Sequence, residues 1–396
     1  MRNRARSRSV NRLWIVLELL YACGDNVRPI ERPPAPQVSS AGGPVLVGPE
    51  IVPIFFAGDD DMQHQLEAFL DQLATSAYWR TATSEYGIGA PTIDASIVAI
   101  ETPPTTDGEL QALLESHVGS PLVAATTVGF PVRWQAPNAN TVYVVFLPTG
   151  VTLTAGSDTS CVTFGGYHDE TAQSHIVYAL LPRCTPSGAP IDAITPALSH
   201  ELVEAATDPH PSAAPAFVVV DNADIVWAFT PGAELGDMCE YVHAARQRLV
   251  GDYLVQRTWS NTSAAAGHDP CVPTLSAPYV AAAPVFGDVT LAVSGTPVIT
   301  QGIQITTGTS ATIDLALFSD APTANWTVGA DDVASVVQAL PAELSMSLNQ
   351  TVGNNGDVVE LTIKRLKNGD GGGSELVITS KVGGETTSLW WGLVTN

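Results

Sequence analysis

Two kinds of hydrophobic patterning divide the chain near residue 273, and they constrain its fold more than any other feature. Before this point, apolar runs typical of strands alternate with amphipathic stretches typical of helices. After it, short alternating or β-branched runs follow one another, separated by turn signals such as Asn354-Asn355-Gly356. Residues 273–284 hold three prolines among small residues, as in an exposed linker. A chain of 396 residues divided in this way is expected to form two domains.

The first domain, residues 43–272, is predicted to be a zincin-like α+β domain with a mixed sheet and helices. Within the expected helices, Thr106 and Glu109 have the spacing of a capping box. Expected strands cover residues 45–56, 95–100, 141–147 and 175–181. Expected helices cover 59–79, 105–117 and a run from Ala197 that ends at Asp208-Pro209, because proline disfavours a helical residue before it.

The second domain, residues 285–396, is predicted to be an immunoglobulin-like β-sandwich. It contains no catalytic constellation, and such modules commonly serve as spacers or binding accessories, here with the cell wall as an expected contact. Its expected strands cover residues 289–293, 302–306, 311–318, 344–348, 358–364, 375–379 and 387–394.

The segment from Ala197 to Pro209 contains the pattern H-E-x-x-E. On a helix, His200 and Glu204 lie on the same face and could grip one cation. Glu201 could then act as a general base on metal-activated water, as in the H-E-x-x-H zinc proteases. The simpler interpretation is an amphipathic helix with both glutamates in water or paired with arginine. In that case, His200 is a hydrogen-bonded core residue.

A catalytic zinc needs a third protein ligand. Asp237 is preferred, with Glu234 beside the metal or as an alternative ligand, because both precede a cysteine that a disulfide would hold in place. His168 follows two glycines and could bind metal or stabilise an oxyanion. His210 and Asp208 are further candidates. A set of His and carboxylate ligands favours zinc, but another divalent ion stays open.

The N-terminus predicts export. Residues 1–22 combine five arginines with a short apolar run, which is typical of a signal peptide. The order Leu-Tyr-Ala-Cys also resembles a lipobox, which would make Cys23 a lipidation site ahead of a proline-rich tether over residues 23–42. The expected location is the cell envelope or the exterior, with membrane contact only through the lipid.

Charge and cysteine content agree with that location. The chain has 17 Lys and Arg against 40 Asp and Glu, a net charge of −23, which argues against nucleic acid as a partner. Four further cysteines in an exported chain are expected to form disulfides. Spacing favours pairing of neighbours, Cys161 with Cys184 and Cys239 with Cys271.

A set of short motifs in a fixed order resembles bacterial relatives of the phosphate-induced, EXORDIUM-like extracellular family. The resemblance covers residues 43–272 and leaves out the sandwich. The motifs are G-P-V near residue 43, S-A-Y-W, E-Y-G-I-G, G-Y-H, S-H-E-L-V-E-A-A-T-D-P, E-L-G-D-M-C and V-Q-R-T-W-S-N. The plant branch lacks H-E-x-x-E, so membership alone does not imply catalysis. Because this chain retains all three ligand-type residues, it resembles a metallopeptidase.

These features predict an exported zinc-dependent hydrolase that acts on a protein or peptide substrate. Two carboxylates in the ligand set would make the bound water less acidic than three imidazoles would, which favours activity at alkaline pH. The alternative is a non-catalytic surface lipoprotein that binds wall polysaccharide or a protein partner.

Overall fold

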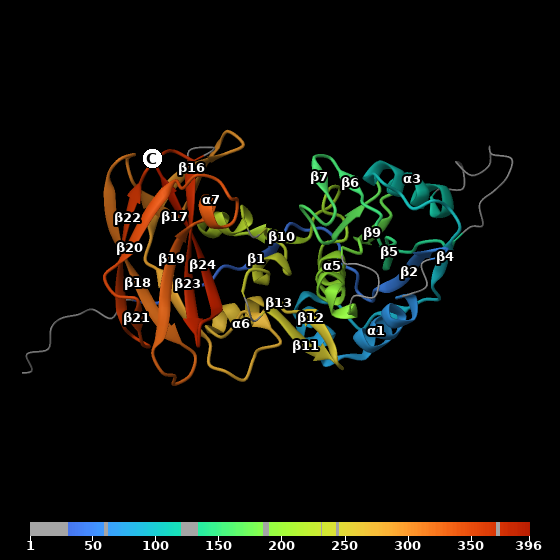
Figure 1. Ribbon diagram of the computed structural model, residues 1–396, viewed down its shortest axis with the longest axis horizontal. Helices are drawn as coiled ribbons and strands as arrows, with labels where there is room; N and C mark the ends of the chain where they lie inside the picture. The colour runs from blue at the N-terminus through green and yellow to red at the C-terminus, as the bar shows by residue number, and fades with distance from the viewer. Residues whose placement is uncertain are drawn as a thin grey trace, which may run out of the picture. The chain divides into compact units, whose positions relative to one another are not determined.

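A computed structural model of the chain describes residues 31–58, 62–119, 134–184, 190–230, 232–242, 245–369 and 373–396. Figure 1 shows its helices and strands, coloured from blue at the N-terminus to red at the C-terminus. The predicted signal peptide and Cys23 lie outside the described residues, so lipidation of Cys23 stays a prediction.

A mixed sheet forms the centre of the first domain. Its strand order is β3-β2-β5-β9-β8, and β4 also pairs with β2. All pairs are parallel except the one that joins the edge strand β8 to β9. The strands are β2 (Glu50–Phe56), β3 (Thr92–Ile93), β4 (Ile97–Ala99), β5 (Thr141–Phe146), β8 (Tyr167–Glu170) and β9 (Val177–Leu181).

Helices cover both faces of this sheet, because alternate side chains of a strand point to opposite faces. Val144 and Ala179 face the core that contains α1 (Gln63–Thr75), α2 (Ala77–Thr83) and α5 (Thr195–Thr207). Val145 and Leu180 face the other core, which contains α3 (Asp107–Val118). Strands buried on both faces explain the continuous apolar runs in the sequence.

Two of the predicted helices differ in detail from the structure. The single helix expected over residues 59–79 is two helices, because Ser76 is extended (ψ 153°) and its hydroxyl caps α2 by accepting from the Trp79 nitrogen. At α3, Thr106 accepts from the Glu109 nitrogen as predicted. The Glu109 carboxylate bonds instead to Thr105, one residue before the position that a capping box requires.

Helix α5 carries the H-E-x-x-E pattern and is buried along nearly its whole length. Pro196 stands in its first turn, where a proline costs no hydrogen bond. The helix ends at Thr207, with Asp208 as its C-cap, as the predicted effect of Pro209 on a helical Asp208 requires.

Short elements complete the first domain. They are the antiparallel pairs β1 (Val38–Ser40) with β10 (Phe217–Val220), β6 (Thr154–Ala155) with β7 (Asp158–Thr159), β11 (Arg246–Val250) with β12 (Tyr253–Gln256), and β13 (Thr258–Trp259) with β14 (Cys271–Val272), together with η1 (Ser84–Tyr86), η2 (Ile191–Ala193), η3 (Asn222–Ala228), η4 (Asp237–Cys239) and α6 (Asn261–Ala266). The predicted tether over residues 23–42 is wrong at its C-terminal end, where β1 forms. Val38 is fully buried and exchanges two hydrogen bonds with the Asn261 side chain, so folded structure begins before residue 43.

The second domain is a β-sandwich, as predicted. One sheet has the order β15-β18-β22-β20, and the other has the order β16-β17-β24-β23-β19-β21. Its elements are β15 (Val280–Pro284), β16 (Gly287–Val293), β17 (Thr296–Gln304), β18 (Ser310–Ser319), β19 (Trp326–Asp332), α7 (Val333–Val336), β20 (Leu344–Leu348), β21 (Val352–Gly353), β22 (Val358–Arg365), β23 (Gly373–Val382) and β24 (Glu385–Thr395).

Alternation builds the sandwich core. In β22, Val359, Leu361 and Ile363 are buried and alternate with more exposed residues. The predicted linker ends too late, because residues 280–284 form β15 and pair with β18. Strand β15 is buried at every position, but its alanine-rich sequence did not predict a strand.

Both predicted disulfides are confirmed. Cys161 and Cys184 are joined with a Cα–Cα distance of 4.9 Å, and Cys239 and Cys271 with one of 5.8 Å. Such bonds are typical of extracellular and envelope proteins. Among the described residues, none of the helices has the length and apolar character needed to cross a membrane.

Candidate metal centre

The predicted site residues meet in one cleft of about 370 Å³. Helix α5 provides one wall, the glycine-rich turn and strand β8 provide a second, and the segment around η4 provides a third. Its lining includes Gly166, His168, His200, Glu201, Glu204, Glu234, Asp237, Glu240, Arg246 and Gln256.

On α5, the helical spacing brings His200 and Glu204 together. The His200 Nε2 lies 2.9 Å from Glu204 Oε2, and both side chains are buried. Glu201 lines the same cleft but turns towards β8, where its Oε2 lies 3.7 Å from His168 Nδ1. Gly166 leaves room for it, because a Cβ there would lie 3.0 Å from Glu201 Oε1.

The backbone before η4 fixes the carboxylate of Glu204. Its Oε1 accepts hydrogen bonds from the backbone nitrogens of Gly236, at 2.9 Å, and Asp237, at 3.1 Å. Residue 236 must be glycine, because a Cβ would lie 2.7 Å from Glu204 Oε1 and 2.8 Å from the His200 ring. With Oε1 held by two N–H groups, Oε2 is the oxygen that faces His200.

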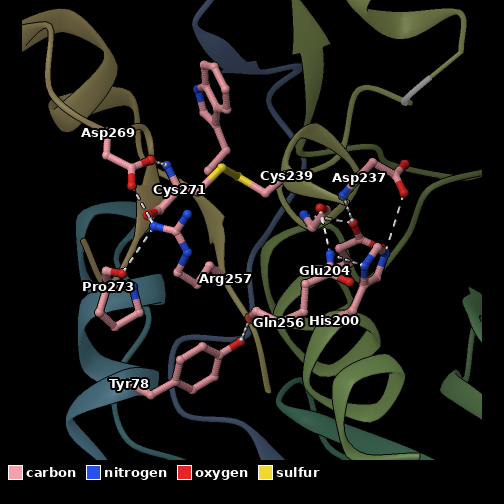
Figure 2. Close-up of a disulfide and its surroundings, with 12 residues drawn as sticks. Tyr78, His200, Glu204, Asp237, Cys239, Gln256, Arg257, Asp269, Cys271 and Pro273 are labelled. Atoms are coloured by element: carbon pink, nitrogen blue, oxygen red, sulfur yellow. Dashed lines mark hydrogen bonds and ion pairs between the residues drawn. A yellow bond between two sulfur atoms is a disulfide. The ribbon is translucent and has the colours of Figure 1, made fainter. Parts of the chain in front are cut away.

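Gln256, at the end of β12, orients His200 from behind. Its Nε2 lies 2.9 Å from the Gly236 carbonyl and 2.8 Å from His200 Nδ1 (Figure 2). A carbonyl only accepts, so this amide nitrogen donates to both groups. In the neutral form of His200, Nδ1 is therefore the acceptor, and Nε2 carries the proton that faces Glu204.

Sequence reasoning missed Gln256 and the Gly236 backbone. The signal was present, because Gln256 lies in the V-Q-R-T-W-S-N motif and Gly236 in E-L-G-D-M-C, yet neither residue type suggested a role. The backbone of Gln256 is itself held by Tyr78, whose hydroxyl donates to the Gln256 backbone carbonyl over 2.6 Å. The disulfide between Cys239 and Cys271 ties η4 to β14, as Figure 2 shows, so the segment around Asp237 is covalently anchored.

Strand β8 brings His168 to the same cluster. Its register partner Ala179 faces α5, and so does His168. The ring is 3% exposed, and its Nε2 lies 3.1 Å from the Asp208 carbonyl, to which it donates. His168 thus lines the cleft with Nε2 already bonded to the backbone.

Two groups of three side chains have ligand atoms within 4.8 Å of one another. One consists of His200, Glu204 and Asp237, and the other of His168, Glu204 and Glu234. His200 Nε2 is 3.5 Å from Asp237 Oδ1, and His168 Nε2 is 3.6 Å from Glu234 Oε1. All four predicted metal ligands thus belong to these groups, and Glu204 belongs to both.

Electrostatics reflect a surplus of buried acids. Burial lowers the pKa of His168, but the carboxylates of Glu234, Glu201 and Glu204 outweigh it and raise the pKa to about 10. Burial similarly lowers the pKa of His200, and Glu204 and Asp237 raise it well above its ordinary value. Burial raises the pKa of Glu234 to about 8, against the opposing charge of His168. Without a cation, the histidines serve as the counterions of this cluster.

The two remaining ligand candidates lie elsewhere. His210 Nδ1 is 2.7 Å from Glu170 Oε2, and His210 belongs to neither group. Pro209 redirects the chain after α5, as its conformational restriction implies. The Asp208 carboxylate accepts from the Ala216 nitrogen over 2.6 Å and fixes the following turn, while its carbonyl orients His168.

No model of a known protein family matches the chain, and no match is found among curated proteins. Among solved structures, a conjugative transposon lipoprotein from Bacteroides eggerthii is 9% identical and covers 31% of this chain and 100% of its own, with a TM-score of 0.19. The titin M3 domain is 10% identical and covers 29% and 97%, with a TM-score of 0.17. The BIgI domain of the beta protein from S. agalactiae is 14% identical and covers 30% and 95%, with a TM-score of 0.18.

Likenesses at these scores carry no argument about the fold or the function of this chain. The resemblance to the EXORDIUM-like family is not matched by any of them and stays a prediction.

Proposed function

We propose that the chain is a zinc-dependent hydrolase that cleaves peptide bonds outside the cytoplasm. The observation that carries this proposal is the position of Glu201. Its side chain lines an open cleft. Glu201 follows His200 in the sequence and lies one helical turn before Glu204, and His200 and Glu204 form the ligand pair. The mixed sheet, with an antiparallel edge strand beside this helix, supports a zincin-like arrangement.

The residues that would hold the zinc are His200, Glu204 and Asp237, which all line the cleft. A zinc ion there would supply a Lewis acid and a water molecule of lowered pKa. Glu201 would take the proton from that water as it attacks a substrate carbonyl, and then pass it to the leaving nitrogen.

The donor set fits zinc. Contacts of 3.5 Å between His200 Nε2 and Asp237 Oδ1 are too long for a hydrogen bond. Zinc bonds of about 2.0–2.2 Å, arranged tetrahedrally, place neighbouring ligand atoms about 3.3–3.6 Å apart. The gap between His200 and Asp237 is therefore the size that a shared cation spans, whereas the 2.9 Å contact between His200 and Glu204 must open to admit one. The backbone nitrogens of residues 236 and 237 donate to Glu204 and supply the kind of supporting hydrogen bonds that metal ligands need.

Hydrolysis of an unfolded protein by the zinc-loaded chain tests this function. Glu201→Gln is expected to bind as much zinc as the wild type and to lose at least a hundredfold in rate. Glu240→Gln is a matched control, since Glu240 lines the cleft but belongs to neither ligand group. Equal rates for Glu201→Gln and wild type would refute the proposal and favour a non-catalytic surface protein.

A further inference from the structure

His168 is the histidine that the proposed single-zinc site does not use. Its side chain is buried, and it faces three acids. Nδ1 is 3.7 Å from Glu201 Oε2 and 3.8 Å from Glu204 Oε2, while Nε2 is 3.6 Å from Glu234 Oε1. The buried imidazole thus lies among three carboxylates, each farther from it than a short hydrogen bond.

The Asp208 carbonyl determines which nitrogen of His168 is free. Because this carbonyl can only accept, Nε2 carries a proton and donates to it. In neutral imidazole, Nδ1 then presents a lone pair to the cleft side of the ring. A histidine fixed by a backbone carbonyl on one nitrogen, with the other free, has the arrangement that protein metal ligands commonly show.

The ligand atoms around the His168 ring match a cation site. One ligand atom each from His168, Glu204 and Glu234 lies within 4.8 Å of the other two. Glu204 Oε2 is 3.8 Å from His168 Nδ1, near the edge of a tetrahedron with bonds of about 2.0–2.2 Å. The same oxygen lies 2.9 Å from His200 Nε2, so it stands between the two imidazoles.

Charge argues for more than one ion. Five carboxylates and one arginine line the cleft, a net of four negative charges when the histidines are neutral: Glu201, Glu204, Glu234, Asp237, Glu240 and Arg246. One divalent ion, with both histidines neutral, would leave two negative charges in a largely buried cluster. Uncompensated buried charge is costly. A second divalent ion would neutralise the cluster.

We infer that this cleft binds two divalent cations bridged by Glu204 Oε2. His200 and Asp237 complete the first position, and His168 and Glu234 complete the second. The inference rests on the proposed zinc site and extends it. Paired sites of this kind hold their ions about 3.5–4 Å apart. The second position makes His168 and Glu234 metal ligands, whereas a single zinc ion at the first position would not use them.

Metal stoichiometry tests the inference. The full chain is stripped with a chelator, loaded with zinc, dialysed and measured for zinc per chain. Wild type is expected to hold two ions. Glu234→Gln and Asp237→Asn should each hold one, and Glu204→Gln should hold none tightly. Glu240→Gln is the matched control and should keep both.

Two further measurements keep the outcomes distinct. Circular dichroism and thermal melting show whether each variant folds. Electron paramagnetic resonance of the manganese-loaded wild type should show exchange-coupled ions, whereas a remote surface ion would give only uncoupled signals. One zinc per chain that Glu234→Gln leaves unchanged would overturn the second position and keep the proposed function. No bound zinc would overturn both.

Discussion

The backbone nitrogen of Gly236 donates a 2.9 Å hydrogen bond to Glu204 Oε1, and no larger residue could make this approach. A Cβ at position 236 would lie 2.7 Å from the same oxygen and 2.8 Å from the His200 ring. This contact holds one carboxylate oxygen in place and leaves the other for the cation. The close packing of Gly236 thus fixes the positions of Glu204 and His200, the two main ligands of the proposed zinc site.

Gly236→Ala is therefore expected to weaken zinc binding at least tenfold, because the added methyl group displaces Glu204 and His200 together. Titration with a competing zinc chelator measures the affinity. Gly165→Ala is the control, since Gly165 lines the same cleft and a Cβ there meets nothing within 4 Å. Equal affinities for the two variants would show that the Gly236 contact does not position the ligands.

Gln256 should matter for the tautomer of His200. Zinc at Nε2 requires the ring proton on Nδ1, so the Gln256 amide must turn over, give up its hydrogen bond to the Gly236 carbonyl and present its oxygen to Nδ1. Gln256→Leu is expected to lose about ten- to a hundredfold in zinc affinity, the usual effect of removing such a support. Gln256→Glu should bind zinc more tightly than Gln256→Leu, because its carboxylate accepts from Nδ1–H. Indistinguishable affinities would remove Gln256 from the site.

The disulfide between Cys239 and Cys271 is expected to support both stability and binding. It closes a loop with a sequence separation of 32, for which the chain-entropy model gives about 3–4 kcal/mol. The double variant Cys239→Ser, Cys271→Ser should unfold at lower denaturant and bind zinc more weakly, since Asp237 loses its anchor. Denaturant titration and zinc competition measure the two effects. Unchanged zinc affinity in the folded variant would contradict the anchoring role.

Asp224 gives a pH prediction away from the cleft. Burial and the nearby Asp221 raise its pKa from an ordinary 3.8 to about 6. The folded state therefore disfavours the ionised form. This cost is absent below about pH 3.8, grows as the pH rises, and is complete above about pH 6.

Asp224→Asn should accordingly raise the free energy of unfolding at pH 8 by about 1–2 kcal/mol, a figure reduced for the partial exposure of this side chain. At pH 3.5 the variant and wild type should unfold alike. Urea titrations at both values make the comparison. A gain that is the same at both pH values would show that ionisation of Asp224 is not its cause.

Local patterns predicted much of this fold. The periodicity of α1 and α3 and the continuous apolar runs of β2, β5 and β9 followed from the chain itself. Strand β15 did not, because a run of alanines carries no strand preference until β18 pairs with it. Likewise, β19 was missed because its strand ends in Gly329, Ala330 and two aspartates, residues that turns also favour.

The site divides in the same way. His200 and Glu204 were predictable because helical spacing alone brings them together. The backbone donor of Gly236 and the amide of Gln256 reach them from segments 32 and 56 positions away, which only the tertiary fold aligns. His168 was predicted as a candidate from its glycine-rich loop, but its position beside Glu201 and Glu204 depends on the register of β8 with β9.

Anomalous diffraction at the zinc edge, from crystals of the full chain soaked in zinc, tests the central claim most directly. We expect a peak in the cleft about 2.0–2.2 Å from His200 Nε2 and from oxygens of Glu204 and Asp237. The two-ion inference adds a second peak beside His168. A cleft without any anomalous peak, in crystals whose soaking solution holds zinc in excess, would contradict the account.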